Sequence, residues 1–287
     1  MEIEGNGQTV SHKWFMISGQ DADGDQTGTV EEIDFADATP KWKIVGSILQ
    51  PLSTTKAVLL PDGKVLIGQG VNRSAGCNVG GRPCTYEEKE GLHFQMFDPA
   101  TASITKLART TVSRGLHGTA TLLPDASVFF AGENREALVR PDDPSFPLMT
   151  SYAGTVPAGD PDLGVPVGQV FYPPYLFQRG GGQSARPVIA QYPDRIPFGG
   201  HFEIRVAGHA DEIGSVVLLR SDHNTHSLTT GDRYIKLAFE GGGRGAGGLR
   251  VKAPNLPAQA IPGIYMLYVV DKRGVPSVGR RVDILVP

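Results

Sequence analysis

Four carboxylates in one short segment have the spacing of a metal-binding loop. DADGDQTGTVEE (residues 21–32) places them at the first, third, fifth and twelfth positions of a calcium loop, as Asp21, Asp23, Asp25 and Glu32. Alternate carboxylates on a tight turn can converge on one hard cation, so the segment is a candidate calcium site. Gln26 stands where such a loop needs glycine, and the flanking residues are typical of strands rather than helices. A solvated acidic turn between two strands is the competing interpretation.

The two cysteines of the chain, Cys77 and Cys84, stand at the ends of the Gly-rich segment GCNVGGRPC. A loop of this length can close a disulfide, which would place the protein in an oxidising compartment, secreted or at the cell surface. Two free thiols are the alternative. A zinc site is disfavoured because no histidine or second cysteine pair lies nearby at zinc-ligand spacing.

Composition indicates a globular all-β protein. Frequent glycine (37) and proline (22) break the 287 residues into short segments, a pattern typical of many strands joined by tight turns. The net charge of −3 comes without a basic run, which disfavours nucleic acid as a partner. No apolar stretch reaches the roughly eighteen residues that a membrane span needs.

An internal repeat predicts the architecture of the first half. LLPDGKVLIGQG (59–70) and LLPDASVFFAGEN (122–134) each run from an apolar pair through a Pro-Asp turn into a second strand. HFQMFDPATASITKL (93–107) adds a strand, a turn and a strand, and residues 13–20 and 29–46 repeat this second half. Four strands in this order form one blade of a kelch-type β-propeller. We expect about two to three blades, an incomplete ring. Either the chain is a fragment, or another chain completes the ring.

The composition and the strand pattern of the sequence change in its second half. Residues 141–168 are rich in Pro, Gly and Asp and predict a surface loop, and from about residue 184 seven short strands follow one another. Seven strands in roughly a hundred residues are typical of an immunoglobulin-like β-sandwich. The predicted domains are therefore residues 1–168, the propeller blades with the loop, and residues 169–287, the sandwich.

Four segments resemble the galactose oxidase and glyoxal oxidase family of copper radical oxidases. VFYPPYLFQRGGGQSARPVI (170–189) is similar to the family's passage from the last blade into an early-set sandwich, and GIYMLYVVDKRGVPSVGRRVDI (263–284) to its closing hairpin. DHNTHSLTTGDRYIKL (222–237) resembles the sandwich loop that carries a copper-binding histidine, here His226. RGLHGTATLLPD (114–125) resembles the blade strand where an adjacent tyrosine and histidine bind copper. The histidine is kept as His117.

This resemblance implies copper bound by His117 and His226, but also a departure from the family's chemistry. The axial tyrosine, which would take the substrate proton, is replaced by Leu116. The tyrosine cross-linked to cysteine that stores an electron would lie upstream of residue 1. Leucine can neither ligate copper nor accept a proton, so two of four expected ligands are present. The alternative is that both histidines are buried remnants of a lost site.

The resemblance therefore implies a degenerate or partial copper radical oxidase, with weak or no oxidation of small alcohols or aldehydes to give hydrogen peroxide. A non-catalytic module that binds carbohydrate or protein is the alternative. An exposed aromatic platform would favour sugar binding. Tyr172 and Tyr175, in the YPPY motif, are candidates for it, although tyrosines in this context more often pack at a domain junction.

Overall fold

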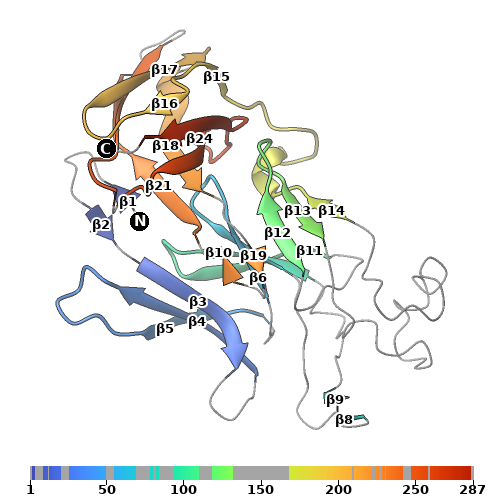
Figure 1. Cartoon of the computed structure of the whole chain (residues 1–287). Helices are drawn as coiled ribbons and strands as arrows, with labels where there is room; N and C mark the ends of the chain where they lie inside the picture. Colours follow the sequence, from blue (N-terminus) through green and yellow to red (C-terminus); the bar gives the residue numbers. More distant parts are fainter. Residues whose placement is uncertain are drawn as a thin grey trace, which may run out of the picture.

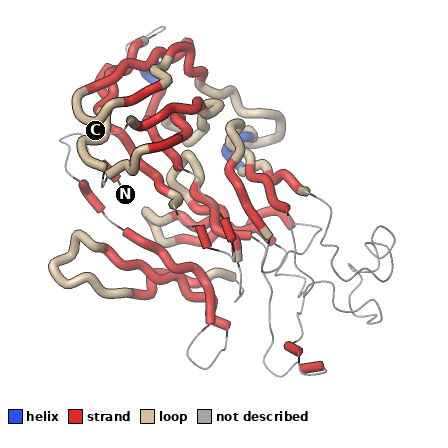
Figure 2. The backbone as a smooth tube through the Cα atoms, in the orientation of Figure 1, coloured by secondary structure: helices blue, strands red, loops and turns tan. Residues whose placement is uncertain are grey.

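The structure is a computed structural model in which strands account for all the long elements (Figure 2). It describes residues 2–3, 9–11, 13–20, 26–49, 55–68, 78–79, 82–83, 93–109, 118–131, 168–208, 210–220, 224–225, 228–229, 231–241, 247–257 and 259–285. The helices in these ranges are the single 3-10 turns η2 (Pro174–Leu176) and η3 (Ala210–Glu212). Neither is long enough or apolar enough to cross a membrane.

Three antiparallel meanders make up the N-terminal part of the described chain (Figure 1). The first meander consists of β3 (Lys13–Gln20), β4 (Gln26–Asp34) and β5 (Lys43–Ser47). The second, in the order β11-β10-β7-β6, consists of β6 (Lys56–Leu59), β7 (Val65–Gly68), β10 (His93–Asp98) and β11 (Ser103–Arg109). The third consists of β12 (Thr119–Leu122), β13 (Val128–Ala131) and β14 (Gln169–Phe171). The two-residue strands β8 (Asn78–Val79) and β9 (Arg82–Pro83) pair with each other.

The predicted repeat is confirmed at the level of the turns. In the second meander, the amide of Leu60 donates to the carbonyl oxygen of Lys64 (2.8 Å), and Leu123 donates to Ser127 in the same way in the third (2.8 Å). The fourth residue of each turn adopts a positive φ, +85° at Gly63 and +65° at the equivalent Ala126. Glycine takes this conformation freely, whereas alanine pays about 1–2 kcal/mol for it.

The three meanders pack face to face. The first and second enclose a cluster that includes Val30, Ile67 and Phe97. The second and third enclose another around Phe94 and Phe130, whose ring centroids lie 4.9 Å apart. This stacking is the packing of successive propeller blades. The described meanders number three, fewer than the four blades of the smallest closed propellers, so they do not close a ring.

The C-terminal part is a β-sandwich of two sheets, as predicted. One sheet has the order β15-β17-β23-β22, and the other contains β16-β25-β24-β18-β21. Between them lies the largest apolar cluster of the described residues, which includes Ile204, Leu218 and Leu267. The strands are β15 (Val188–Gln191), β16 (Arg195–Ile196), β17 (His201–Ala207), β18 (Ile213–Arg220), β21 (Arg233–Leu237), β22 (Phe239–Gly241), β23 (Gly248–Lys252), β24 (Gly263–Asp271) and β25 (Arg280–Ile284).

The structure adds detail at both ends of the segment predicted as propeller. β1 (Glu2–Ile3) pairs in parallel with β21 of the sandwich, and β2 (Thr9–Ser11) pairs with β1. The N-terminal residues thus cover a sandwich edge that would otherwise expose unpaired backbone groups. At the other end, residues 169–171, which the sequence assigned to the sandwich, form β14 and pair with β13 of the third meander.

Candidate functional site

The strands that flank the two candidate copper ligands in the sequence show where the candidate site lies. His117 and His226 lie outside the described residues, as do Leu116, Asp21, Asp23, Asp25, Cys77 and Cys84. The described chain resumes at Gly118, and β12 begins at Thr119. Strands β19 (Asn224–Thr225) and β20 (Leu228–Thr229) pair as a hairpin with Thr225 opposite Leu228, so positions 226 and 227 connect them in the sequence.

Strand β12 contacts strand β19. One belongs to the third meander and the other follows sandwich strand β18, so the contact joins the two parts of the chain (Figure 1). Strand β12, which begins two residues after position 117, is therefore in contact with the strand that ends directly before position 226. Within the described ranges, histidine, cysteine, aspartate and glutamate form no group of three that could hold a metal ion.

Glu32 is the one predicted calcium ligand that lies within the described residues. It sits in β4 with its side chain 5% exposed, and its two carboxylate oxygens pair with Lys13 Nζ (3.1 Å) and Lys43 Nζ (2.9 Å). Burial raises the pKa of Glu32, but hydrogen bonds and charge from both lysines outweigh it and hold the pKa below its usual value. A cation bound by Glu32 would have to displace these two ion pairs. Calcium binding by the three aspartates stays a prediction.

The best-defined polar site in the described chain joins the third meander to the sandwich. The turn residue Ala126 is buried in a cluster with Val217, Leu219, Tyr268 and Val270 of the sandwich. Sequence reasoning did not single out this site. The repeated Pro-Asp turn is the sequence signal that could have indicated it. Equivalent turns of successive blades lie at the same edge of their sheets, so both can contact the same neighbouring domain.

Two tyrosines bring hydroxyl groups to this turn. Tyr268 donates to the carbonyl oxygen of Leu123 (3.2 Å), and Tyr175 donates to that of Ala126 (2.6 Å). Burial, followed by the charge of Asp62, raises the pKa of Tyr175 well above its usual value. The expectation of junction packing is thus confirmed for Tyr175. Tyr172 is 52% exposed.

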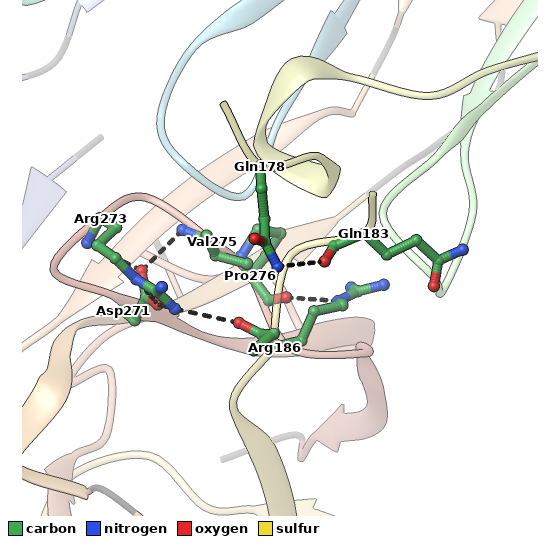
Figure 3. A network of polar contacts seen from close by, with 8 residues as sticks. Gln178, Gln183, Arg186, Asp271, Arg273, Val275 and Pro276 are labelled. Carbon is green, nitrogen blue, oxygen red and sulfur yellow. Dashed lines mark hydrogen bonds and ion pairs between the residues drawn. The ribbon is translucent and has the colours of Figure 1, made fainter. Parts of the chain in front are cut away.

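Arg186 donates hydrogen bonds to three backbone carbonyl groups at the same place, and Figure 3 shows its bond to Pro276. Its Nε donates to the carbonyl oxygen of Pro276 (2.8 Å), its Nη2 to that of Ser277 (2.6 Å) and its Nη1 to that of Asp125 (2.8 Å). Burial lowers the pKa of Arg186, and the charge of Asp125 opposes this effect. A planar fork of donors suits such convergence, because one side chain can satisfy several carbonyl groups at once.

Asp271 and Arg273 fix the neighbouring hairpin between β24 and β25 (Figure 3). Asp271 Oδ1 accepts from the amides of Arg273 and Val275, and Oδ2 accepts from Arg273 Nε and Nη2 (2.9 and 2.6 Å). Arg273 Nη2 also donates to the carbonyl oxygen of Ala185 (3.1 Å). The hairpin, the residues before Arg186 and the blade turn are therefore held as one unit.

Comparison with known proteins identifies relatives for both parts of the chain. The family profile described as "Galactose oxidase-like, Early set domain" matches residues 186–284. The chain is 31% identical to aldehyde oxidase GLOX of Vitis pseudoreticulata over 234 residues, which cover 79% of this chain and 40% of that protein. It is 26% identical to galactose oxidase of Gibberella zeae over 230 residues, 79% of this chain and 28% of that protein.

A solved structure supports the same relationship. A fungal alcohol oxidase of the AA5 family, in complex with copper, superposes with a TM-score of 0.73 at 26% identity, covering 96% of this chain and 52% of that one. The chain therefore has a galactose oxidase-like fold, and the resemblance inferred from the sequence is confirmed. The chain spans less than half the length of the two curated relatives and about half of this oxidase.

Proposed function

Because residues 186–284 form a galactose oxidase-like early set domain and the chain is homologous to proteins named aldehyde oxidase and galactose oxidase, we propose that it is a copper radical oxidase-like protein. In this proposal His117 and His226 bind copper, and oxidation of alcohols or aldehydes is weak or lost. The contact between β12 and β19 carries the proposal, because it joins the strands next to the two histidines.

The donor set suits copper in part. Imidazole nitrogen is a preferred ligand of Cu(II), and two imidazoles with water or a carboxylate can complete a site. Bound copper would orient a substrate oxygen and exchange electrons with it. Relatives of this kind act on galactose or on aldehydes according to their names, so small alcohols, aldehydes or carbohydrates are the proposed substrate class.

The proposed loss of activity rests on Leu116. Its side chain has no atom that can accept a proton from a substrate hydroxyl group, so the general-base step has no group at this position. Because general bases typically contribute 10²–10⁴-fold, any remaining oxidation should be slower by about this factor than with a tyrosine in place. A non-catalytic binding module is the second candidate, favoured by Trp14, Phe35 and Trp42, three exposed aromatic residues in or next to the strands of the first meander.

Localisation follows from the cysteines. If Cys77 and Cys84 form a disulfide, the protein functions in an oxidising compartment, as a secreted or cell-surface protein. Non-reducing and reducing mass spectrometry of the purified chain, with and without alkylation, tests this directly. Two alkylated cysteines before reduction would contradict it.

Copper content after Cu(II) loading and desalting tests the proposed site. We expect near one copper per chain, lost in a His117→Ala/His226→Ala double variant and retained in His201→Ala, which removes an exposed histidine of β17. Equal and negligible copper in all three would refute copper binding. Peroxide production is then measured with galactose, glyoxal and methylglyoxal. Substantial peroxide that disappears in His226→Ala would refute the loss of activity.

A further inference from the structure

The Pro-Asp turn of the second meander carries a carboxylate that is buried at the contact with the sandwich. Asp62 lies in this turn, between β6 and β7, and its side chain is 7% exposed. Leu59, the last residue of β6, packs on the buried cluster that β18 and β24 form at the junction. The hydroxyl group of Tyr234 in β21 lies against Gly63, since an added Cβ there would be 3.3 Å from it. The turn of Asp62 is therefore in contact with the sandwich.

The charge of Asp62 is weakly compensated. Its Oδ2 pairs with Lys64 Nζ at 3.3 Å, and the Lys64 side chain is itself 34% exposed. Its Oδ1 accepts from the amide of Lys64, also at 3.3 Å. Charge-assisted hydrogen bonds between nitrogen and a carboxylate oxygen are usually about 2.7–2.9 Å long. Both contacts of Asp62 are longer, so little stabilises a negative charge in this buried position.

The other groups around Asp62 bring no positive charge of comparable effect. Tyr175 is close enough for the charge of Asp62 to raise its pKa, and Arg186 and Asp125 act on the same tyrosine with opposite effects. Burial raises the pKa of Asp62, and the charge and hydrogen bonds of Lys64 oppose this effect without cancelling it. The folded protein therefore favours the neutral carboxylic acid at this position.

The equivalent turn of the third meander shows that burial, and not the turn itself, distinguishes Asp62. Asp125 stands at the same place in the repeat, but it is exposed. Its Oδ1 accepts from the amide and the hydroxyl group of Ser127, at 2.9 and 2.6 Å. The same Pro-Asp turn thus carries a solvated carboxylate in one blade and a buried one in the other.

We propose that Asp62 makes the contact between the second meander and the sandwich sensitive to pH, so that the contact tightens when this carboxylate takes up a proton. Protonation removes a charge that the site solvates poorly, and the neutral group keeps an oxygen that can accept from the amide of Lys64. The sandwich strands β18 and β21 flank the β19–β20 hairpin in the sequence, and β19 contacts β12. Acid would therefore also hold this hairpin more firmly against the third meander, with or without copper.

The direction of the effect follows from the raised pKa. A group whose pKa is raised on folding contributes stability that is present below its usual pKa and is lost as the pH rises through the raised value. Asp62 is such a group, so the contact should be firmest in acid and looser at neutral pH. Glu32 has a lowered pKa and acts in the opposite direction. Its contribution cancels when the wild type is compared with variants at the junction.

Thermal unfolding of the full chain, followed by circular dichroism between about pH 4.5 and about pH 7.5, tests the proposal. We expect Asp62→Asn, which is neutral at every pH, to melt at a higher temperature than the wild type at neutral pH. This gap should shrink as the pH falls toward the usual aspartate pKa. Lys64→Met removes the countercharge, so its loss of stability should be larger and extend to higher pH. Asp125→Asn is the matched control in the equivalent turn, and its effect should not change with pH.

Amide hydrogen exchange locates the change. After correction for the intrinsic exchange rate, wild-type peptides that cover residues 57–66 and β21 should be protected about threefold better near pH 5 than near pH 7.5. In Asp62→Asn their protection should be the same at both pH values.

Three results would overturn the proposal. One is a difference in melting temperature between the wild type and Asp62→Asn that is constant over the whole pH range. Another is an Asp62→Asn variant that is less stable than the wild type at neutral pH, because the ion pair with Lys64 would then outweigh the cost of burial. The third is a pH profile of Asp125→Asn that matches that of Asp62→Asn.

Discussion

Replacing Arg186 by methionine tests whether its guanidinium group holds the third meander to the sandwich. The substitution keeps much of the aliphatic length and removes three hydrogen bonds to the carbonyl oxygens of Asp125, Pro276 and Ser277. Ser277 is fully buried, so its carbonyl group would be left without this donor in a site poorly accessible to water. Hydrogen bonds to charged groups contribute about 1.5–3 kcal/mol each when buried.

The expected loss is smaller than the sum of three such bonds. The bond to Asp125 lies at the exposed side of the site, where water can replace the lost donor. We therefore expect Arg186→Met to lower the free energy of unfolding by about 3 kcal/mol. At roughly 2–4 °C per kcal/mol for a domain of 150–250 residues, the melting temperature should fall by about 6–12 °C.

Circular dichroism during heating measures this change, and amide hydrogen exchange locates it. Exchange should accelerate in β13 and around Ser277. Tryptophan fluorescence is unsuitable, because both tryptophans lie on the first meander. Arg250→Met is the matched control, since the Arg250 side chain is 55% exposed and its ion pair with Glu240 is 3.9 Å long. The control should change stability by less than about 0.5 kcal/mol.

Two results would refute the reasoning. The first is an equal effect of Arg186→Met and Arg250→Met. The second is full stability of Arg186→Lys, because a lysine ammonium group keeps the charge but cannot reproduce the planar fork that reaches three carbonyl oxygens. In that case the charge of Arg186, and not its geometry, would hold the junction.

Three further substitutions test the meanders. Glu32→Gln removes the charge that pairs with Lys13 and Lys43. The pKa of Glu32 is lowered in the folded protein. Its contribution to stability is therefore present above the usual glutamate pKa and is lost as the pH falls through the lowered value. Urea unfolding followed by tryptophan fluorescence should show the wild type losing stability below about pH 5 and the variant much less, and parallel pH profiles would contradict this. Gly63→Ala should lower the free energy of unfolding by about 1–2 kcal/mol, because φ is +85° and the new Cβ would lie 3.3 Å from Tyr234 Oη. Ala126→Gly at the equivalent turn should change it by less than about 1 kcal/mol. A neutral Gly63→Ala would show that the turn can relax away from Tyr234.

Local sequence determined the strands and turns of this protein. The alternation in KWFMISGQ and the two Pro-Asp turns of the repeat predicted β3, β6–β7 and β12–β13, and the structure confirms them. These features depend on neighbouring residues, because a strand needs alternating apolar side chains and a tight turn needs a residue that accepts positive φ. The family resemblance followed from such local segments as well.

Tertiary structure alone decided which distant segments meet. The contact of β12 with β19, the pairing of β1 with β21 and the three carbonyl groups around Arg186 join residues far apart in the chain. An arginine in the sequence carries donors but does not specify their acceptors. Likewise, the pattern of β3 shows that it has two faces. Which face is buried depends on where the second meander packs, and that packing partly buries Phe15 and leaves Trp14 exposed.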